Sequence, residues 1–127
     1  MKFAEHKDPS LNIVRKITPD AIWVNDQALS ESFFMTQHHL HPQWDITSIE
    51  ALNTKHLDTL LALRPTLIIL GTGSQQIFPS AELSAYVLQK GVGLEIMHND
   101  AACRTWNVLT TEERAVVLAI IQPKTAV

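Results

Sequence analysis

The chain has 127 residues, and the 46% that are hydrophobic suffice to bury one ordinary core. Ten basic and thirteen acidic side chains give a formal net charge of −3 without a block of like charge, so a nucleic-acid-binding surface is not expected. No apolar run approaches the roughly 18 residues that span a bilayer, and residues 1–9 lack the features of a targeting signal. We therefore expect a single cytoplasmic domain over residues 1–127, with no membrane insertion.

The first third of the chain has the pattern of short strands. Between residues 12 and 37, β-branched and aromatic side chains form short runs separated by turn-forming residues such as Pro19 and Asn25. This pattern predicts an antiparallel strand meander. Residues 38–44 are polar and broken by Pro42, and residues 45–52 fit a strand and a loop equally well, so that segment stays open.

The middle of the chain predicts a helix followed by a buried strand. Thr54 can cap a helix that Arg64 and Pro65 would end. Its apolar positions lie three and four residues apart, at Leu57, Leu60, Leu61 and Leu63. Residues 66–70 are an uninterrupted apolar run before Gly71, typical of a strand buried on both faces, and we place this strand at the centre of a parallel sheet.

A second helix and strand complete a β-α-β unit. Pro79 and Ser80 can open a helix that Gly91 closes, and residues 93–97 have the character of the next strand. This order predicts a right-handed crossover and an α/β core.

The end of the chain allows two interpretations. Asn99 or Asp100 can cap a helix through about Leu109. After it, residues 110–113 fit a capping box that would start another helix over residues 116–121. The alternative is a final buried strand over residues 116–121, because four of those residues are β-branched, ended by Pro123.

The glycines mark one candidate site. Gly71-Thr72-Gly73 lies at the carboxyl end of a predicted strand, where α/β sheets bind ligands. The dinucleotide fingerprint would need a glycine where Gln76 stands, and a phosphate-binding Walker loop would need Gly-Lys-Ser/Thr. Glu95 lies at a plausible distance along the chain for a ribose-binding acid. However, the helix that follows the glycines starts only near Ser80, which places its positive end away from them. A structural tight turn is favoured over an anion or small-ligand loop.

The second candidate site is the thiol of Cys103, in the first turn of a predicted helix and beside Arg104. The helix dipole and the guanidinium would both stabilise a thiolate. His98 could act as its base, although nearness in sequence does not establish contact. A small buried side chain is the favoured interpretation of Cys103. Arg104, Thr105 and Asn107 can instead cap backbone groups, or line a groove shared with the Gly71–Gly73 loop.

No metal site or cofactor is expected. Cys103 is the only cysteine, and His38, His39 and His41 have no acidic or thiol partner at a recognisable spacing. These histidines are interpreted as part of a solvated loop.

Three segments resemble a known family: LIILGTG at residues 67–73, GVGLEIM at 91–97 and AACRTWNVL at 101–109. Nearly the whole chain is similar, in order, to a small family of proteins of unknown function from bacteria, archaea and eukaryotes. Its eukaryotic members include the mitochondrial respiratory complex I assembly factor 3 and an adipogenesis-associated protein. The chain departs from many relatives at Asn99, where Thr is common, and at Trp106, where Tyr or Phe is usual.

The resemblance implies a three-layer α/β domain around a central mixed sheet, with a last strand at about 116–121 that runs antiparallel to its neighbours. It thereby favours the strand for residues 116–121.

Two functions compete. The first is a non-catalytic protein-interaction or assembly factor with an unidentified protein partner and the possibility of a homo-oligomer. The second is a small-ligand binder or enzyme that uses a groove formed by Gly71, Thr72, Gly73, Glu95, Cys103, Arg104, Thr105 and Asn107. The first is favoured, because nucleophilic catalysis needs a thiol, a base and oxyanion donors together, and only the thiol has a sequence signal.

Overall fold

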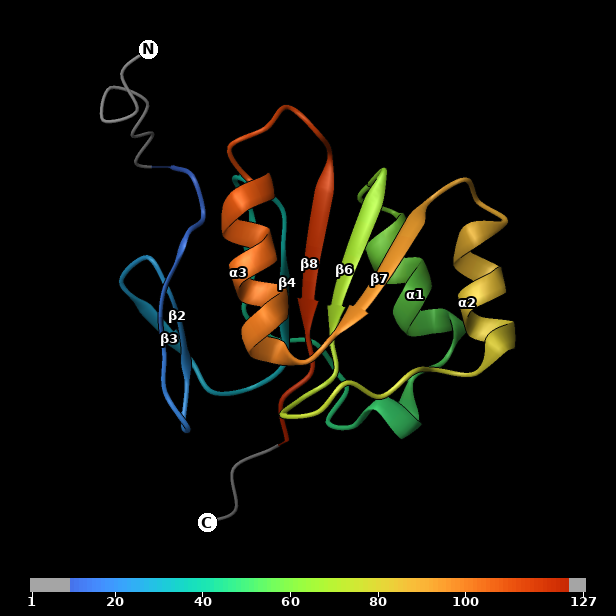
Figure 1. The fold of residues 1–127 in the computed structure, drawn as a ribbon, viewed down its shortest axis with the longest axis horizontal. Helices are drawn as coiled ribbons and strands as arrows, with labels where there is room; N and C mark the ends of the chain where they lie inside the picture. The colour runs from blue at the N-terminus through green and yellow to red at the C-terminus, as the bar shows by residue number, and fades with distance from the viewer. Residues whose placement is uncertain (1–9, 124–127) are drawn as a thin grey trace.

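The computed structural model describes residues 10–123, which form a three-stranded sheet, a five-stranded sheet and three α-helices. Residues 1–9, for which no targeting signal is expected, lie outside the described residues, as do residues 124–127. The smaller sheet lies beside the larger one, next to helix α3 (Asn99–Leu109) (Figure 1). Within the described residues, no helix is long and apolar enough to cross a membrane.

The predicted meander is present as β1 (Val14–Ile17), β2 (Ile22–Val24) and β3 (Gln27–Leu29), paired antiparallel in that order. Asn25 has φ 51°, a left-handed conformation that asparagine tolerates, which allows the tight turn between β2 and β3. The next strand, β4 (Phe33–Met35), leaves the meander and pairs with the larger sheet.

The larger sheet has the strand order β5-β4-β8-β6-β7, with β5 at Leu40–His41. Strands β6 (Leu67–Gly71), β7 (Gly93–Met97) and β8 (Val116–Ile120) are parallel to one another. β8 is antiparallel only to β4, so the expectation that the last strand runs antiparallel to its neighbours is wrong on the β6 side. The crossover through α3 returns the chain to the end of the sheet where β6 begins, and β8 must therefore run in the same direction as β6. β8, and not β6 as expected, is the middle strand.

The helices start one residue away from the predicted caps in two cases. Helix α1 (Thr54–Leu61) is capped by Asn53, whose side chain accepts from the His56 N–H while the His56 ring accepts from the Asn53 N–H. Helix α2 (Ala81–Leu88) is capped by Ser80, as predicted. Helix α3 is capped by the His98 ring instead of Asn99 or Asp100.

The structure decides between the interpretations that the sequence left open for two other segments. The open segment 45–52 is a loop that contains a short 3₁₀ helix, η2 (Ile49–Ala51). Residues 110–114 form turns and bends, so the predicted capping box starts no helix, and residues 116–120 are the buried strand that the resemblance favoured.

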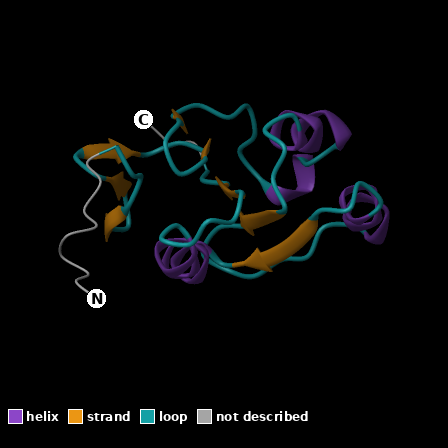
Figure 2. Ribbon diagram, turned by 90° about the horizontal axis from the view of Figure 1, so that it is seen from above, coloured by secondary structure: helices purple, strands orange, loops and turns teal. Residues whose placement is uncertain are grey.

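Both faces of the larger sheet are covered (Figure 2). On one face, Ile69, Leu118 and Phe33 pack against α3 and the meander. On the other face, Ile68, Leu70 and Val117 pack against α1, α2 and residues of the 44–52 loop. The alternation of side chains along β6 and β8 supplies both cores, which explains why these strands are apolar at every position.

Candidate functional site

The carboxyl ends of β6, β7 and β8 meet at one edge of the sheet, where the sequence placed its first candidate site. The Gly71–Gly73 loop at this edge is held by Asn99. The Asn99 Oδ1 accepts from the Gly73 N–H at 3.0 Å, and its Nδ2 donates to the Ile121 C=O at 3.0 Å. The Asn99 N–H also donates to the Gly73 C=O at 2.8 Å. One side chain therefore ties together the chain segments that follow β6, β7 and β8.

Each of the two glycines of this loop is required for a different structural reason. A Cβ on Gly71 would lie 2.6 Å from Ile120 Cδ1 and would also meet Asn99 Oδ1, so only glycine fits beside the Asn99 side chain. Gly73 has φ +111°, which L-residues rarely adopt. The Thr72 hydroxyl donates to the Gln75 C=O and accepts from the Ile77 N–H at 3.0 Å. The structural tight turn that the sequence favoured accounts for all three residues.

Cys103 faces the core beneath α3 and is 1% exposed. The pKa of its thiol is raised to about 12, mainly by burial and to a smaller extent by the nearby Asp100 carboxylate, while Arg104 partly offsets the rise. The His98 ring, the base considered from the sequence, accepts from the Ala101 N–H at 3.3 Å as the helix cap. The favoured interpretation of Cys103 as a buried side chain agrees with this geometry, and the thiolate nucleophile does not.

The remaining predicted residues face different neighbours. Asn107 reaches the meander, where its Oδ1 accepts from the Val14 N–H at 2.9 Å and its Nδ2 donates to the Val14 C=O at 2.8 Å. Thr105 lies on the β7 side of α3 and donates to the Met97 sulfur at 3.4 Å. Arg104 and Glu95 are exposed. These contacts do not bring the eight predicted residues together in one groove.

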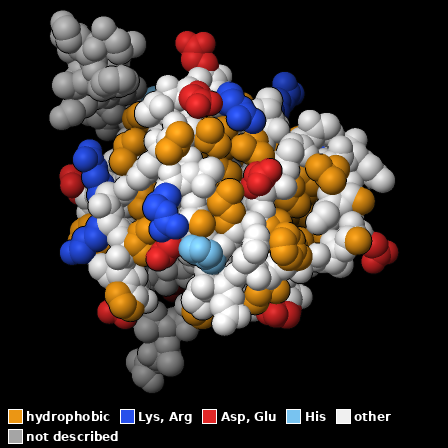
Figure 3. Space-filling view, viewed as in Figure 1, with side chains coloured by type: hydrophobic (Ala, Val, Ile, Leu, Met, Phe, Trp, Pro, Cys, Tyr) orange, Lys and Arg blue, Asp and Glu red, His pale blue; other side chains and the backbone are white. Residues whose placement is uncertain are grey.

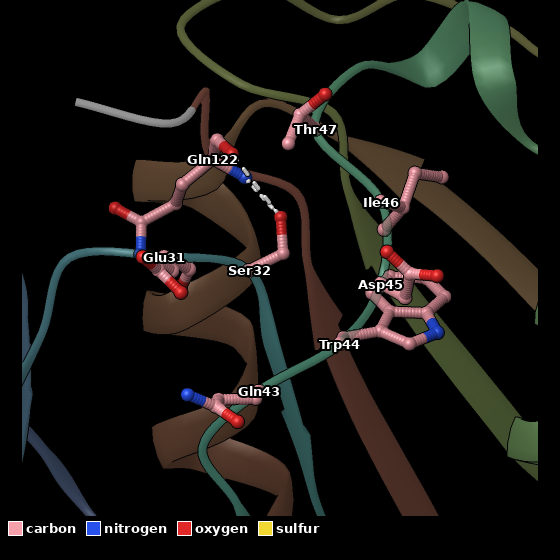
Figure 4. Close-up of a pocket in the computed structure, with 8 residues that line it drawn as sticks. All are labelled: Glu31, Ser32, Gln43, Trp44, Asp45, Ile46, Thr47 and Gln122. Atoms are coloured by element: carbon pink, nitrogen blue, oxygen red, sulfur yellow. Dashed lines mark hydrogen bonds between the residues drawn. The ribbon is translucent and has the colours of Figure 1, made fainter. Parts of the chain in front are cut away.

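Two hollows flank the carboxyl end of β8. The first, of about 420 Å³, includes Gly73 from the predicted set. Its lining residues are Ile17, Thr18, Pro19, Ile22, Gly73, Ser74, His98, Asn99, Asp100, Gln122 and Pro123. The second, of about 450 Å³, lies between Glu31-Ser32, residues 43–47 and Gln122 (Figure 4). In it, the Gln122 N–H donates to the Ser32 hydroxyl at 2.8 Å, and the Trp44 indole nitrogen lies on the side away from Ser32 and Gln122 (Figure 4). Gln122 Nε2 also donates to the Glu31 C=O at 2.8 Å, whereas the buried Trp44 Nε1 has no hydrogen-bond partner among residues 10–123.

The three loop histidines make separate contacts. His41 stacks on Phe34 with ring centroids 4.4 Å apart, and His38 Nδ1 lies 3.0 Å from the Ser10 hydroxyl. Within residues 10–123, no group of three or more His, Cys, Asp or Glu side chains is arranged to hold a metal ion.

An exposed apolar pair that was not predicted lies on the loop between β6 and α2. Ile77 is 39% exposed and Phe78 is 68% exposed. We call this pair the apolar tip. Two large apolar residues between Gln76 and Pro79, outside any predicted helix or strand, were the available signal. On the face that carries α3 and β7, acidic and basic side chains are interspersed among apolar ones, without a continuous charged surface (Figure 3).

The chain is similar to a family of proteins and to several solved structures. Residues 14–121 match the family described as "Protein of unknown function (DUF498/DUF598)". A solved Xanthomonas campestris protein is 41% identical with a TM-score of 0.81, over 90% of this chain and 86% of the other. A Bordetella parapertussis protein is 29% identical with a TM-score of 0.83, over 89% of this chain and 97% of the other.

Two curated relatives have more informative names. The "13 kDa major membrane protein" of Francisella tularensis is 37% identical over 65% of this chain and 67% of that protein. The "NADH dehydrogenase [ubiquinone] 1 alpha subcomplex assembly factor 3" of Xenopus tropicalis is 30% identical over 65% of this chain, and the match spans 46% of the frog protein. The match over residues 14–121 confirms the resemblance seen in the sequence: the chain belongs to the DUF498/DUF598 family of proteins of unknown function.

Proposed function

We propose that this protein is a non-catalytic protein-interaction factor that helps a larger assembly to form, and that the apolar tip is its principal contact surface. The observation that carries the proposal is the exposure of Phe78, which is 68% accessible although it is a large aromatic side chain. Aromatic side chains are frequent anchors of protein interfaces, because they bury much apolar area with little loss of conformational freedom.

Two hydrogen bonds hold the loop that carries the apolar tip. The Thr72 hydroxyl accepts from the Ile77 N–H at 3.0 Å, and Gln76 Nε2 donates to the Ile96 C=O on β7 at 2.9 Å. A loop that is already ordered loses less entropy when a partner binds. Beside it lies a hollow of about 300 Å³ that could receive an apolar side chain of the partner. Its lining residues are Ile49, Glu50, Leu52, Ile77, Phe78, Pro79, Ser80 and Leu83.

The relatives support an assembly role, since a DUF498/DUF598 match is shared with proteins named as assembly factors. The alternative function, a small-ligand binder or enzyme at Gly71–Gly73 and Cys103–Arg104, has less support. Asn99 and Thr72 occupy the hydrogen-bonding groups of the glycine loop, and the Cys103 thiol is buried.

The test compares the proteins retained by immobilised variants in extracts of the native host. Phe78→Ser should lose a protein that the unaltered chain retains in stoichiometric amount. Leu88→Ser is the matched control, because Leu88 is an apolar side chain on α2 that is 57% exposed and lies outside the tip. The proposal is wrong if Phe78→Ser retains the same proteins as the unaltered chain, or if both variants lose them equally.

A further inference from the structure

Val116, the first residue of β8, has backbone groups that no neighbouring strand pairs with in the part of the chain that the structure describes. The Ala115 C=O accepts from the Thr66 and Leu67 N–H groups, and the Ile121 N–H donates to the Gly71 C=O, so the odd-numbered residues of this strand point their backbone groups at β6. Because these groups alternate along a strand, Val116 points its N–H and C=O towards β4. The pairing of β4 with β8 ends at Met35 and Leu118, two residues beyond Val116.

The chain turns away at that point. The Thr36 N–H donates to the His39 C=O, and the Gln37 C=O, which would otherwise face Val116, accepts from the Asn12 N–H at 2.7 Å. Within residues 10–123, the Val116 N–H and C=O have no hydrogen-bond partner on this side. Val116 is only 2% exposed. A buried backbone donor and acceptor without partners is costly and calls for water or a ligand.

Val116 is one of the residues that line a hollow of about 520 Å³ at the amino end of β6 and β8, which we call the β8 hollow. Its lining surface is mainly apolar and includes three histidines. The lining residues are Thr36, Gln37, His38, His39, His41, Leu63, Pro65, Ala115, Val116 and Val117. Binding sites for small molecules have this character, since most of their wall is apolar and a few polar groups fix the orientation of the ligand.

We propose that the β8 hollow binds a small apolar molecule that carries a primary carboxamide. The carboxamide oxygen accepts from the Val116 N–H, and its syn N–H donates to the Val116 C=O. The apolar body of the ligand packs against Leu63 and Pro65. A carboxylate lacks the donor and would place negative charge against the Val116 C=O. A trans secondary amide directs its N–H and C=O to opposite sides and so can satisfy only one of the two backbone groups.

The test is a titration of the ¹⁵N-labelled chain with benzamide, followed by amide NMR shifts. The Val116 amide proton should move downfield and saturate, as expected for a newly hydrogen-bonded N–H. Benzoate and N-methylbenzamide have nearly the same apolar body, and each should bind about fivefold more weakly, because each lacks one hydrogen bond of about 1 kcal/mol. Equal affinity for the three compounds, or saturation without a shift of the Val116 amide, would overturn the proposal.

A pair of variants locates the site independently. Leu63→Glu should abolish benzamide saturation, whereas Leu88→Glu, on the exposed side of α2, should leave the affinity unchanged. If Leu63→Glu does not fold, the comparison of the three compounds on the unaltered chain still decides the question. The β8 hollow and the apolar tip lie at opposite ends of β6, so failure here leaves the proposed interaction role untouched.

Discussion

Replacing Asn99 by alanine should destabilise the whole carboxyl edge of the sheet. The substitution removes the hydrogen bonds from the Gly73 N–H and to the Ile121 C=O, both 3.0 Å long, and leaves these half-buried and buried groups unpaired. Counting about 1 kcal/mol for each bond and allowing for the unpaired groups, we expect a loss of about 2–3 kcal/mol in the free energy of unfolding. At about 3–5 °C per kcal/mol for a domain of this size, Tm should fall by roughly 10 °C.

Gly71→Ala sharpens this prediction, because its new methyl group would meet the Asn99 side chain and Ile120 Cδ1. In the unaltered background we expect a cost of about 1–3 kcal/mol from overpacking. In the Asn99→Ala background, part of that clash is gone. The double variant should therefore lose less stability than the sum of the losses of the two single variants. Urea unfolding followed by tryptophan fluorescence measures both, with Gln75→Ala, at an exposed position of the same loop, as a control. A change below about 0.5 kcal/mol for Asn99→Ala, or strict additivity of the pair, would refute the reasoning.

Four further outcomes are expected. Cys103 should react with a thiol reagent only after denaturation, and fast labelling of the native protein would contradict this. The free energy of unfolding should fall as pH rises from about 9 towards 12, because the pKa of the thiol is 9.0 in the unfolded chain and about 12 in the folded one. Thr110→Val should raise stability by about 1 kcal/mol, because the buried Thr110 hydroxyl has no partner among residues 10–123; a clear loss in chemical denaturation would argue for a hidden partner. Asn107→Ala should release β1, seen as faster amide exchange at Val14 with little change in β6; unchanged exchange would mean that the meander is held by packing alone. Arg64→Gly should stabilise the chain by about 0.5–1 kcal/mol, because Arg64 has φ 58°; a lower Tm would show that the arginine makes a compensating contact.

The β6-α2-β7 unit could be predicted because each of its elements has local signals. The apolar run before Gly71, the Ser80 cap and the left-handed stop at Gly91 all act within a few residues of the chain. The segment after Thr110 shows the limit of such signals. Its capping-box residues favour a helix locally, but five consecutive buried positions in β8 gain more by filling both cores of the sheet.

The position of β8 and the candidate site depended on contacts between remote residues. Nothing near β4 in sequence indicates that it leaves the meander to pair with β8, some 85 residues later. Asn99 likewise joins loops that are 22 and 26 residues away from it. The orientation of Cys103 was within reach of the sequence, since Cys103 and Trp106 lie three residues apart on one face of α3 with Ala102. The apolar tip could have been noticed from Ile77 and Phe78, but its exposure could not.

The central place of β8 has a consequence for how the sheet can form. Strands β4 and β5 pair with each other, as do β6 and β7, but the two pairs touch only through β8. Until β8 inserts, the sheet is two separate ribbons, each with an unpaired apolar edge. Folding therefore requires contacts between residues far apart in sequence, which slows folding. Until those contacts form, the unpaired strand edges can associate with other chains. A truncated chain that ends before Val116 should consequently bind chaperones, whereas a chain that includes Ile121 should not once it is released from the ribosome.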